Sequence, residues 1–298
     1  MPTHSSDRLA PWRGPAPGRP DLPLPPARMP AWRGWRPLKR WTWVGAFGPE
    51  VMLCAAIARI GPATAAWWAV WDRDARRFEE RSLRRAGGLV VTPERVHVPG
   101  VMELEVAEAA SVEVVSPHGA QHIWTRKRGG VEVRGTVGGR EVDLRGLVDE
   151  SAGYHARHTA WRWSAGVGVT EAGAAVAWNL VDGLHDAPEA SERTVWVAGE
   201  PREVGPVAFG ARPAGTTPEA EHEVQLAALE PRADLAGVAF AEGCALRFTA
   251  EATRSRRENL LLVRSAYEQP FGAFTGELPG AGALREGFGV MERHDVVW

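Results

Sequence analysis

Short runs of alternating apolar and polar residues, separated by tight turns, constrain the fold of this chain more than any other feature. The clearest case is VEVRGTV at residues 131–137, followed by Gly138-Gly139 and then by REVDL at residues 140–144. Alternation with a period of two is typical of a strand with one buried face. A pair of glycines suits a two-residue hairpin turn, because both turn positions need a positive φ. The sequence therefore predicts a β-hairpin here, with φ above zero at both glycines.

The same pattern recurs along most of the chain. AWRWSAGVGV at residues 160–169 alternates, a turn is expected at 170–173, and AAVAWNLV at 174–181 returns. Residues 51–60 (VMLCAAIARI) suit either a short helix or a buried strand, and periodicity does not decide between the two. Many short strands without strand–helix alternation indicate an all-β fold, an antiparallel barrel or sandwich with few short helices.

The chain is predicted to divide into an arm and two β-units. Prolines recur through residues 1–30, where they exclude helix and central strand, so a disordered or polyproline II arm is expected. Trp12 could still pin part of the arm to the body. The remaining length fits two barrels or sandwiches in tandem better than one giant sheet, at residues 31–150 and 151–298.

The composition argues against some classes of binding partner and cellular location. The chain has 35 basic and 37 acidic residues, so no global basic field is available for nucleic acid or an anionic membrane. No apolar stretch is long enough to span a bilayer, and the N-terminus lacks the apolar core of a signal peptide. Cys54 and Cys244 lie in apolar runs and are expected as free thiols, so a cytoplasmic location is predicted. All the basic residues except Lys39 and Lys127 are arginines.

Familiar catalytic and metal motifs are missing. The chain has no P-loop, no H-E-x-x-H and no G-x-S-x-G motif. His118 and His122 are four residues apart, but they lie in SPHGAQHIW, which reads as a turn and has no nearby acid. We therefore predict no metal and no cofactor.

Tryptophan is over-represented, with 14 residues against 8 Phe and 2 Tyr. If residues 154–163 form a strand, alternation places His155, Arg157, Thr159, Trp161 and Trp163 on one face. Aromatic rings mixed with an imidazole and a guanidinium resemble the lining of a cavity with a few polar groups. Arg157, Trp161 and Trp163 are therefore candidate ligand contacts, and His155 is a candidate acid or base. The alternative is a tryptophan core whose polar neighbours lie at its rim.

Two further polar clusters are candidates for a site. Trp178, Asn179 and Asp182 lie at the end of a predicted strand; the first two are candidate ligand contacts and Asp182 a candidate catalytic residue. In the C-terminal segment, Glu292 and His294 share one face of a predicted strand. If that face points inward, the carboxylate should orient the imidazole and raise its pKa. If it points outward, both are ordinary surface residues.

Several segments resemble a bacterial family catalogued as domain of unknown function 2804. They are residues 123–137 (IWTRKRGGVEVRGTV), 154–166 (YHARHTAWRWSAG), 178–200 (WNLVDGLHDAPEASERTVWVAGE), 265–280 (SAYEQPFGAFTGELPG) and 287–298 (GFGVMERHDVVW). The resemblance covers most of the chain from about Trp32. It implies a relation to the lipocalin-like superfamily and hence two calycin-like barrels in tandem. It implies no reaction, because fold alone is a weak guide to function.

Three functions remain open at this point. The leading hypothesis is a protein that binds an apolar small molecule, a lipid or isoprenoid, in a tryptophan-lined barrel cavity. The alternative is a cofactor-free acid–base enzyme, a cyclase, hydratase or isomerase, that acts on such a molecule. The third is a structural or interaction protein with filled barrels. A cavity with a convergent histidine and carboxylate would favour the enzyme.

Overall fold

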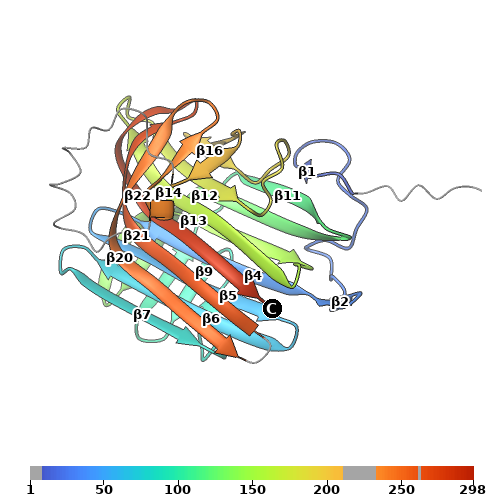
Figure 1. Cartoon of the computed structure of the whole chain (residues 1–298). Coiled ribbons are helices and arrows are strands. Elements are labelled where there is room, and N and C mark those ends of the chain that lie inside the picture. Colours follow the sequence, from blue (N-terminus) through green and yellow to red (C-terminus); the bar gives the residue numbers. More distant parts are fainter. Residues whose placement is uncertain (1–8, 211–232, 261–262) are drawn as a thin grey trace, which may run out of the picture.

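The fold is almost entirely β-structure. The computed structural model describes residues 9–210, 233–260 and 263–298, and within them the single helical element is the 3-10 turn η1 (Ala233–Leu235). Two large antiparallel sheets and one small hairpin, β2 (Trp32–Arg33) with β3 (Arg36–Pro37), make up the rest (Figure 1). The predicted all-β fold with two antiparallel units in tandem is confirmed.

The first sheet has eleven strands, and its main path runs in the order β7-β6-β5-β4-β13-β12-β10-β9-β8. Its strands are β1 (Trp12–Arg13), β4 (Lys39–Phe47), β5 (Val51–Ile60), β6 (Ala63–Asp72), β7 (Arg77–Leu83), β8 (Val90–Val91), β9 (Arg95–Val98), β10 (Met102–Val106), β11 (Ser111–His118), β12 (Gln121–Val137) and β13 (Arg140–Gly153).

The second sheet has nine strands in the order β17-β16-β15-β14-β22-β21-β20-β19-β18. They are β14 (His158–Thr170), β15 (Ala175–Asp182), β16 (Thr194–Val197), β17 (Glu200–Glu203), β18 (Val207–Phe209), β19 (Gly237–Phe240), β20 (Ala245–Leu260), β21 (Val263–Leu278) and β22 (Gly282–Val297).

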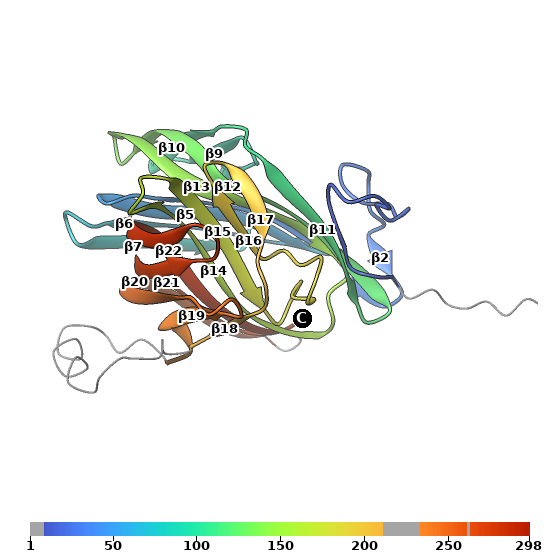
Figure 2. The same ribbon diagram turned by 90° about the horizontal axis from the view of Figure 1, so that it is seen from above.

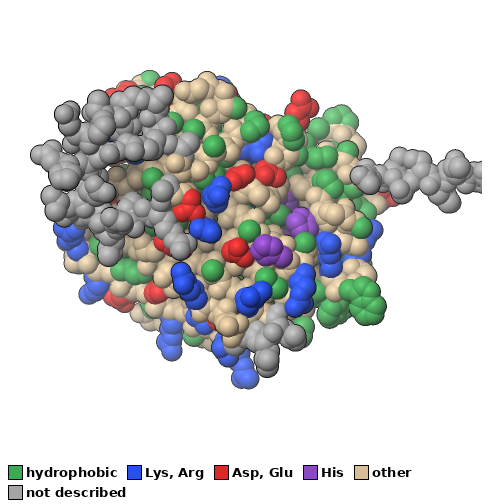
Figure 3. Space-filling view, in the orientation of Figure 1, with side chains coloured by type: hydrophobic (Ala, Val, Ile, Leu, Met, Phe, Trp, Pro, Cys, Tyr) green, Lys and Arg blue, Asp and Glu red, His purple; other side chains and the backbone are tan. Residues whose placement is uncertain are grey.

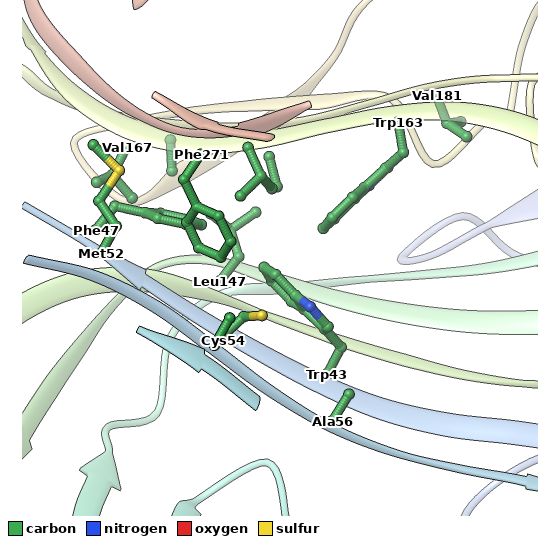
Figure 4. Close-up of a cluster of buried hydrophobic side chains, with 14 of the residues drawn as sticks. Trp43, Phe47, Met52, Cys54, Ala56, Leu147, Trp163, Val167, Val181 and Phe271 are labelled. Atoms are coloured by element: carbon green, nitrogen blue, oxygen red, sulfur yellow. The ribbon is translucent and has the colours of Figure 1, made fainter. Parts of the chain in front are cut away.

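Each sheet curls around its own apolar core, and a third core joins the two sheets. One core lies between β4–β6 and β8–β13 of the first sheet, and another lies inside the second sheet. Figure 2 shows strands β5 and β6 between β9–β10 on one side and β20–β22 on the other. The third core fills this junction; in Figure 4, Trp43 of the first sheet and Trp163 of the second point toward each other.

This layering explains the sequence of β5. Val51, Leu53 and Ala55 face the core of the first sheet, whereas Met52 and Cys54 face the core between the sheets. A strand buried on both faces needs no polar residues, so it loses the alternation that identifies a half-buried strand. The segment that suited either a helix or a strand is therefore a strand, and its continuous apolar run reflects its place in a middle layer.

The predicted glycine hairpin is present. Residues Val137 and Arg140 pair across the turn, and φ is 58° at Gly138 and 81° at Gly139. Both values lie in the left-handed region that a type I′ turn requires. The prediction is confirmed at both positions.

Tryptophan packing accounts for two other glycines. A β-carbon on Gly45 would lie 2.1 Å from the ring of Trp43, and one on Gly166 would lie 2.2 Å from the ring of Trp178. Both indoles are buried, and the missing β-carbon of each glycine leaves room for the ring to lie directly over the backbone. Trp178 packs in the core of the second sheet, so part of the tryptophan excess is plain core, as one of the two interpretations proposed.

The N-terminal arm differs from the prediction of disorder over its described part. Strand β1 pairs with β11, and Leu24, 1% exposed, packs with Met29 against Trp124 and Tyr154. Proline content argued correctly against helix and central strand, but it does not prevent apolar side chains from docking. Residues 9–30 are thus part of the packed body, while residues 1–8 lie outside the described part.

Two compositional predictions can also be compared with the structure. Cys54 and Cys244 are both free, the first buried and the second half-buried. Among the described residues, no helix has the length and apolar character needed to cross a membrane.

Candidate functional site

A cavity of about 660 Å³ lies between the two sheets, next to the core that joins them. Its walls come from β4–β7, β12 and β13 on one side and from β14 and β20–β22 on the other, with the segment between β15 and β16 closing one part. The sequence led us to expect a cavity inside one barrel. The barrel interiors hold apolar cores instead, so the space for a small molecule arises where the two units meet.

Tryptophan rings form much of the cavity wall. Trp161 and Trp163 lie two residues apart on β14, so they project from the same face of the strand. The Trp163 ring meets the Trp43 ring edge to face, with centroids 5.0 Å apart. The full set is Trp41, Trp43, Trp67, Trp161, Trp163 and Trp298. The second interpretation of the tryptophan excess, a lined cavity, therefore also holds.

Glu292 is the most chemically distinctive residue of the cavity. Its carboxyl accepts hydrogen bonds from Trp161 Nε1 and from Gln269 Nε2, both at 2.8 Å. The Gln269 carbonyl is in turn 3.5 Å from the Cys54 thiol of the opposite sheet. Burial raises the pKa of Glu292 to about 7, although hydrogen bonds from Trp161 and Tyr267 oppose the shift. This carboxyl therefore titrates near neutral pH.

His294 lies beside Glu292 in the cavity, but the two side chains do not form the expected pair. The imidazole Nε2 lies 2.9 Å from Ser265 Oγ, and the ring packs on Trp161 with centroids 4.5 Å apart. Burial, together with the charge of Arg254, lowers the pKa of His294 to about 3. The predicted rise in its pKa is thus wrong, because burial and the Arg254 charge outweigh the raising effect of Asp295.

A second buried group of charges lies where β12 and β13 of the first sheet meet the segment between β15 and β16. Lys127 Nζ is 2.6 Å from Asp149 Oδ1 and 3.4 Å from Glu192 Oε1. Burial raises the pKa of Glu192 to about 7, against the opposing charge of Lys127. Burial alone would lower the pKa of Lys127, but Asp149 and Glu192 raise it. The lysine is therefore cationic, and it stands between one carboxylate and one carboxyl that titrates near neutral pH.

Arginines line another part of the cavity wall. Arg84 and Arg85 follow β7, and Arg256 on β20 pairs with Glu258 at 2.7 Å. Figure 3 shows basic side chains gathered along the lower part of one face, where β6, β7 and β20 lie in Figure 1. Further in, the buried Arg254 guanidinium stacks over Tyr267 at 4.7 Å. The wall thus combines charged groups with the apolar tryptophan surface.

Two of the four candidate catalytic residues, Glu292 and His294, line the cavity, and the other two do not. His155 precedes β14 instead of continuing it; it is fully buried, and burial and the charge of Lys39 hold its pKa well below the ordinary value. Asp182 pairs with Arg162 at 3.0 Å, and both side chains are partly exposed.

Of the five candidate ligand contacts, two line the cavity and three do not. Trp161 and Trp163 line the cavity, whereas Arg157 is exposed and donates to the C-terminal Trp298 backbone oxygen at 3.3 Å. Trp178 is buried in the core of the second sheet. Asn179 stands behind the wall, where its Oδ1 accepts from Trp163 Nε1 at 2.8 Å. It positions a wall residue instead of touching the cavity.

Sequence reasoning did not select Lys127, Asp149, Glu192 or Tyr267. One signal was present, since the chain uses arginine almost throughout and retains only two lysines. Both Lys39 and Lys127 are buried. An ammonium group is compact enough to fit between two carboxyls, where a planar guanidinium would need more space. A rare lysine in an arginine-rich chain can therefore indicate a buried charge.

The arrangement is suited to proton transfer. Two buried carboxyls that titrate near pH 7, Glu292 on β22 and Glu192 in the segment before β16, line the same cavity. Within the described residues, no group of three or more His, Cys, Asp or Glu side chains could hold a metal ion.

Comparison with known protein families assigns the chain to one of them. A family model described as domain of unknown function (DUF2804) matches residues 89–298. The chain belongs to the DUF2804 family. The match begins later than the resemblance from about Trp32 suggested, but it includes Lys127, Glu192 and Glu292. The two large antiparallel sheets of this DUF2804 protein agree with the two antiparallel β-units predicted from the sequence. A search of curated proteins finds no match.

Several solved structures align with most of this chain at low sequence identity. An AttH-like protein of Nitrosomonas europaea has a TM-score of 0.46 and 13% identity, covering 93% of this chain and 98% of that one. Kievitone hydratase from Nectria haematococca has a TM-score of 0.47 and 10% identity, covering 87% and 88%. CghA has a TM-score of 0.35 and 12% identity, covering 93% and 95%. At these values, the activities of the neighbours are not transferred to the DUF2804 protein.

Proposed function

We propose that this protein is a cofactor-free acid–base enzyme that acts on a hydrophobic small molecule between its two sheets, as a cyclase, hydratase or isomerase. The observation that carries the proposal is the Glu292 carboxyl, which is 7% exposed, lines the cavity and has a pKa of about 7. An ordinary glutamate has lost its proton at neutral pH, whereas this one still has a proton to donate. The tryptophan wall would hold the apolar substrate.

Glu192 supplies the complementary half of a proton transfer. In the proposed step, neutral Glu292 gives its proton to one carbon of a substrate alkene, and ionised Glu192 removes a proton from a carbon next to the cation formed. The double bond moves, and the enzyme passes from one singly protonated state to the other. If water attacks the cation instead, its oxygen forms the new bond, and its released proton goes to a carboxylate, which completes a hydration.

The decisive experiment first identifies a substrate and then compares turnover by the wild type and two variants. Small molecules that copurify with the protein, identified by untargeted mass spectrometry, are incubated with the wild type, with Glu292→Gln and with Glu286→Gln, an exposed control on the same strand. We expect Glu292→Gln to keep binding and to lose turnover by roughly 10²–10⁴-fold, because its amide cannot donate as an acid. Full turnover in this variant would remove Glu292 from the mechanism.

The tryptophan wall favours a second candidate, a carrier of an apolar molecule such as a lipid or isoprenoid. Trp161 is the better reporter here, because it is half-buried, whereas Trp163 also packs in the core between the sheets. A carrier should bind its ligand saturably, with quenching of tryptophan fluorescence that Trp161→Phe reduces. It should release the ligand unchanged, and Glu292→Gln should not alter the yield of any product.

A further inference from the structure

Several buried polar atoms of the described cavity wall have no hydrogen-bond partner, and besides the indole nitrogens of Trp43 and Trp67 and two atoms held in ion pairs, three remain. They are Ser151 Oγ, His185 Nε2 and Glu192 Oε2. The three residues are 3%, 6% and 2% exposed, so solvent at the surface of the protein does not reach them freely. A buried polar atom without a partner costs stability, and such atoms in native proteins call for an explanation.

The three residues form one group around Lys127. Glu192 contacts Lys127, which also pairs with Asp149, and Ser151 follows two residues later on the same face of β13. The backbone N–H of Glu192 donates to the backbone oxygen of His185 at 3.1 Å. The charge of Lys127, after burial, lowers the pKa of His185, so the imidazole is close to the same group and neutral.

His185 is held in place with an unusual backbone. Its φ is 53°, a left-handed conformation that is uncommon outside glycine, and its Nδ1 lies 2.8 Å from Ser116 Oγ. That contact occupies one ring nitrogen and leaves the other without a partner. Local strain kept by a folded protein is often found at functional sites.

We propose that this group is a subsite for a hydroxyl group of the hydrophobic ligand. A hydroxyl both donates and accepts, so it can meet the Ser151 hydroxyl, the neutral His185 imidazole and the Glu192 oxygen together. The surrounding charges argue for a neutral group, because Asp149 and Glu192 already balance Lys127 and would repel an anion. The ligand is thus an alcohol or phenol with an apolar body along the tryptophans. The inference rests on the proposed function in that it uses the same cavity.

The test compares three matched probes by calorimetric titration: farnesol, its methyl ether and the hydrocarbon farnesene. Farnesol should bind the wild type at least about tenfold more tightly than farnesene, because two or three hydrogen bonds are made only with the alcohol. The ether accepts but cannot donate, so its affinity should lie between the two.

Ser151→Ala is the decisive variant, since Ser151 Oγ bonds no protein atom and the change should not lower the melting temperature. It should weaken farnesol binding by roughly two- to tenfold and leave farnesene unchanged. Ser255→Ala, an exposed serine outside the cavity, is the control.

Equal affinities for the three probes, no saturable binding of any probe, or an equal loss for alcohol and hydrocarbon in Ser151→Ala would overturn the subsite. A crystal structure with farnesol that shows only water at Ser151 would do the same. Turnover reports on the proposed function separately. Discrimination of the hydroxyl together with full activity in Glu292→Gln would keep the subsite and reject the enzyme mechanism.

Discussion

Replacing Glu292 with glutamine should make the protein less sensitive to rising pH. The carboxyl titrates near 4.5 in the unfolded chain and near 7 in the folded protein. Because its folded pKa is raised, the fold favours the protonated form. The stability that depends on this proton is fully present below about pH 4.5 and is lost as the pH rises to about 7. Glutamine, which is always neutral, does not undergo this loss.

The size of the effect follows from the shift. A difference of about 2.5 pKa units corresponds to about 3 kcal/mol at high pH, of which about 2.5 kcal/mol develops between pH 5 and pH 8. Glu292 is 7% exposed, so solvent screening should reduce this value little. Relative to the wild type, Glu292→Gln should therefore gain about that much free energy of unfolding over this range.

Urea unfolding at several pH values measures this difference directly. Subtracting the two curves cancels the opposing contribution of His294, whose lowered pKa stabilises the fold as the pH rises from about 3 to about 6.5. Glu286→Gln, on the same strand but exposed, should follow the wild type. If the difference between Glu292→Gln and the wild type stays constant from pH 5 to pH 8, the carboxyl is not held protonated by the cavity and our reasoning fails.

Three other substitutions test the fold and the second charged group. Leu24→Ala should lower the free energy of unfolding, measured by urea titration, by about 2–5 kcal/mol, because the docked arm loses a buried side chain. No change would mean that the arm does not pack. Gly138→Val should cost about 1–2 kcal/mol, measured in the same way, since φ is 58° there, and a neutral result would contradict the type I′ turn. Lys127→Met should cost about 3–5 kcal/mol at pH 8 and less at pH 5, where Glu192 is protonated. Equal losses at both pH values in thermal melts would argue against the charge pairing.

Local structure was largely readable from the sequence because strands and turns depend on near neighbours. Alternation and the Gly138-Gly139 pair predicted the β12–β13 hairpin, and the same reasoning located most of β14 and β15. Alternation could not identify residues 51–60 as a strand, because a strand in a middle layer is apolar on both faces. Docking of the arm was predicted only as a possibility through Trp12, which does pair with β11, because proline content restricts the backbone and does not report side-chain burial.

The candidate site was readable only in part. Alternation correctly grouped Glu292 with His294 and Trp161 with Trp163, but it could not show that the two pairs are cross-strand neighbours on one face of the second sheet. The pKa of His294 was predicted in the wrong direction, because desolvation depends on everything packed around a residue. His155 was misplaced since β14 begins three residues later, at His158.

The sequence by itself determined the all-β class, the hairpins and the membership of a family, because these depend on local patterns of residues. Only the tertiary structure decided that the cavity lies between the two sheets and that Glu292, Glu192 and Lys127 all line it. Glu292 lies on β22, Glu192 in the segment before β16, and Lys127 on β12, so no local pattern relates them. Their chemistry depends on burial, and burial is set by how two separate sheets pack against each other.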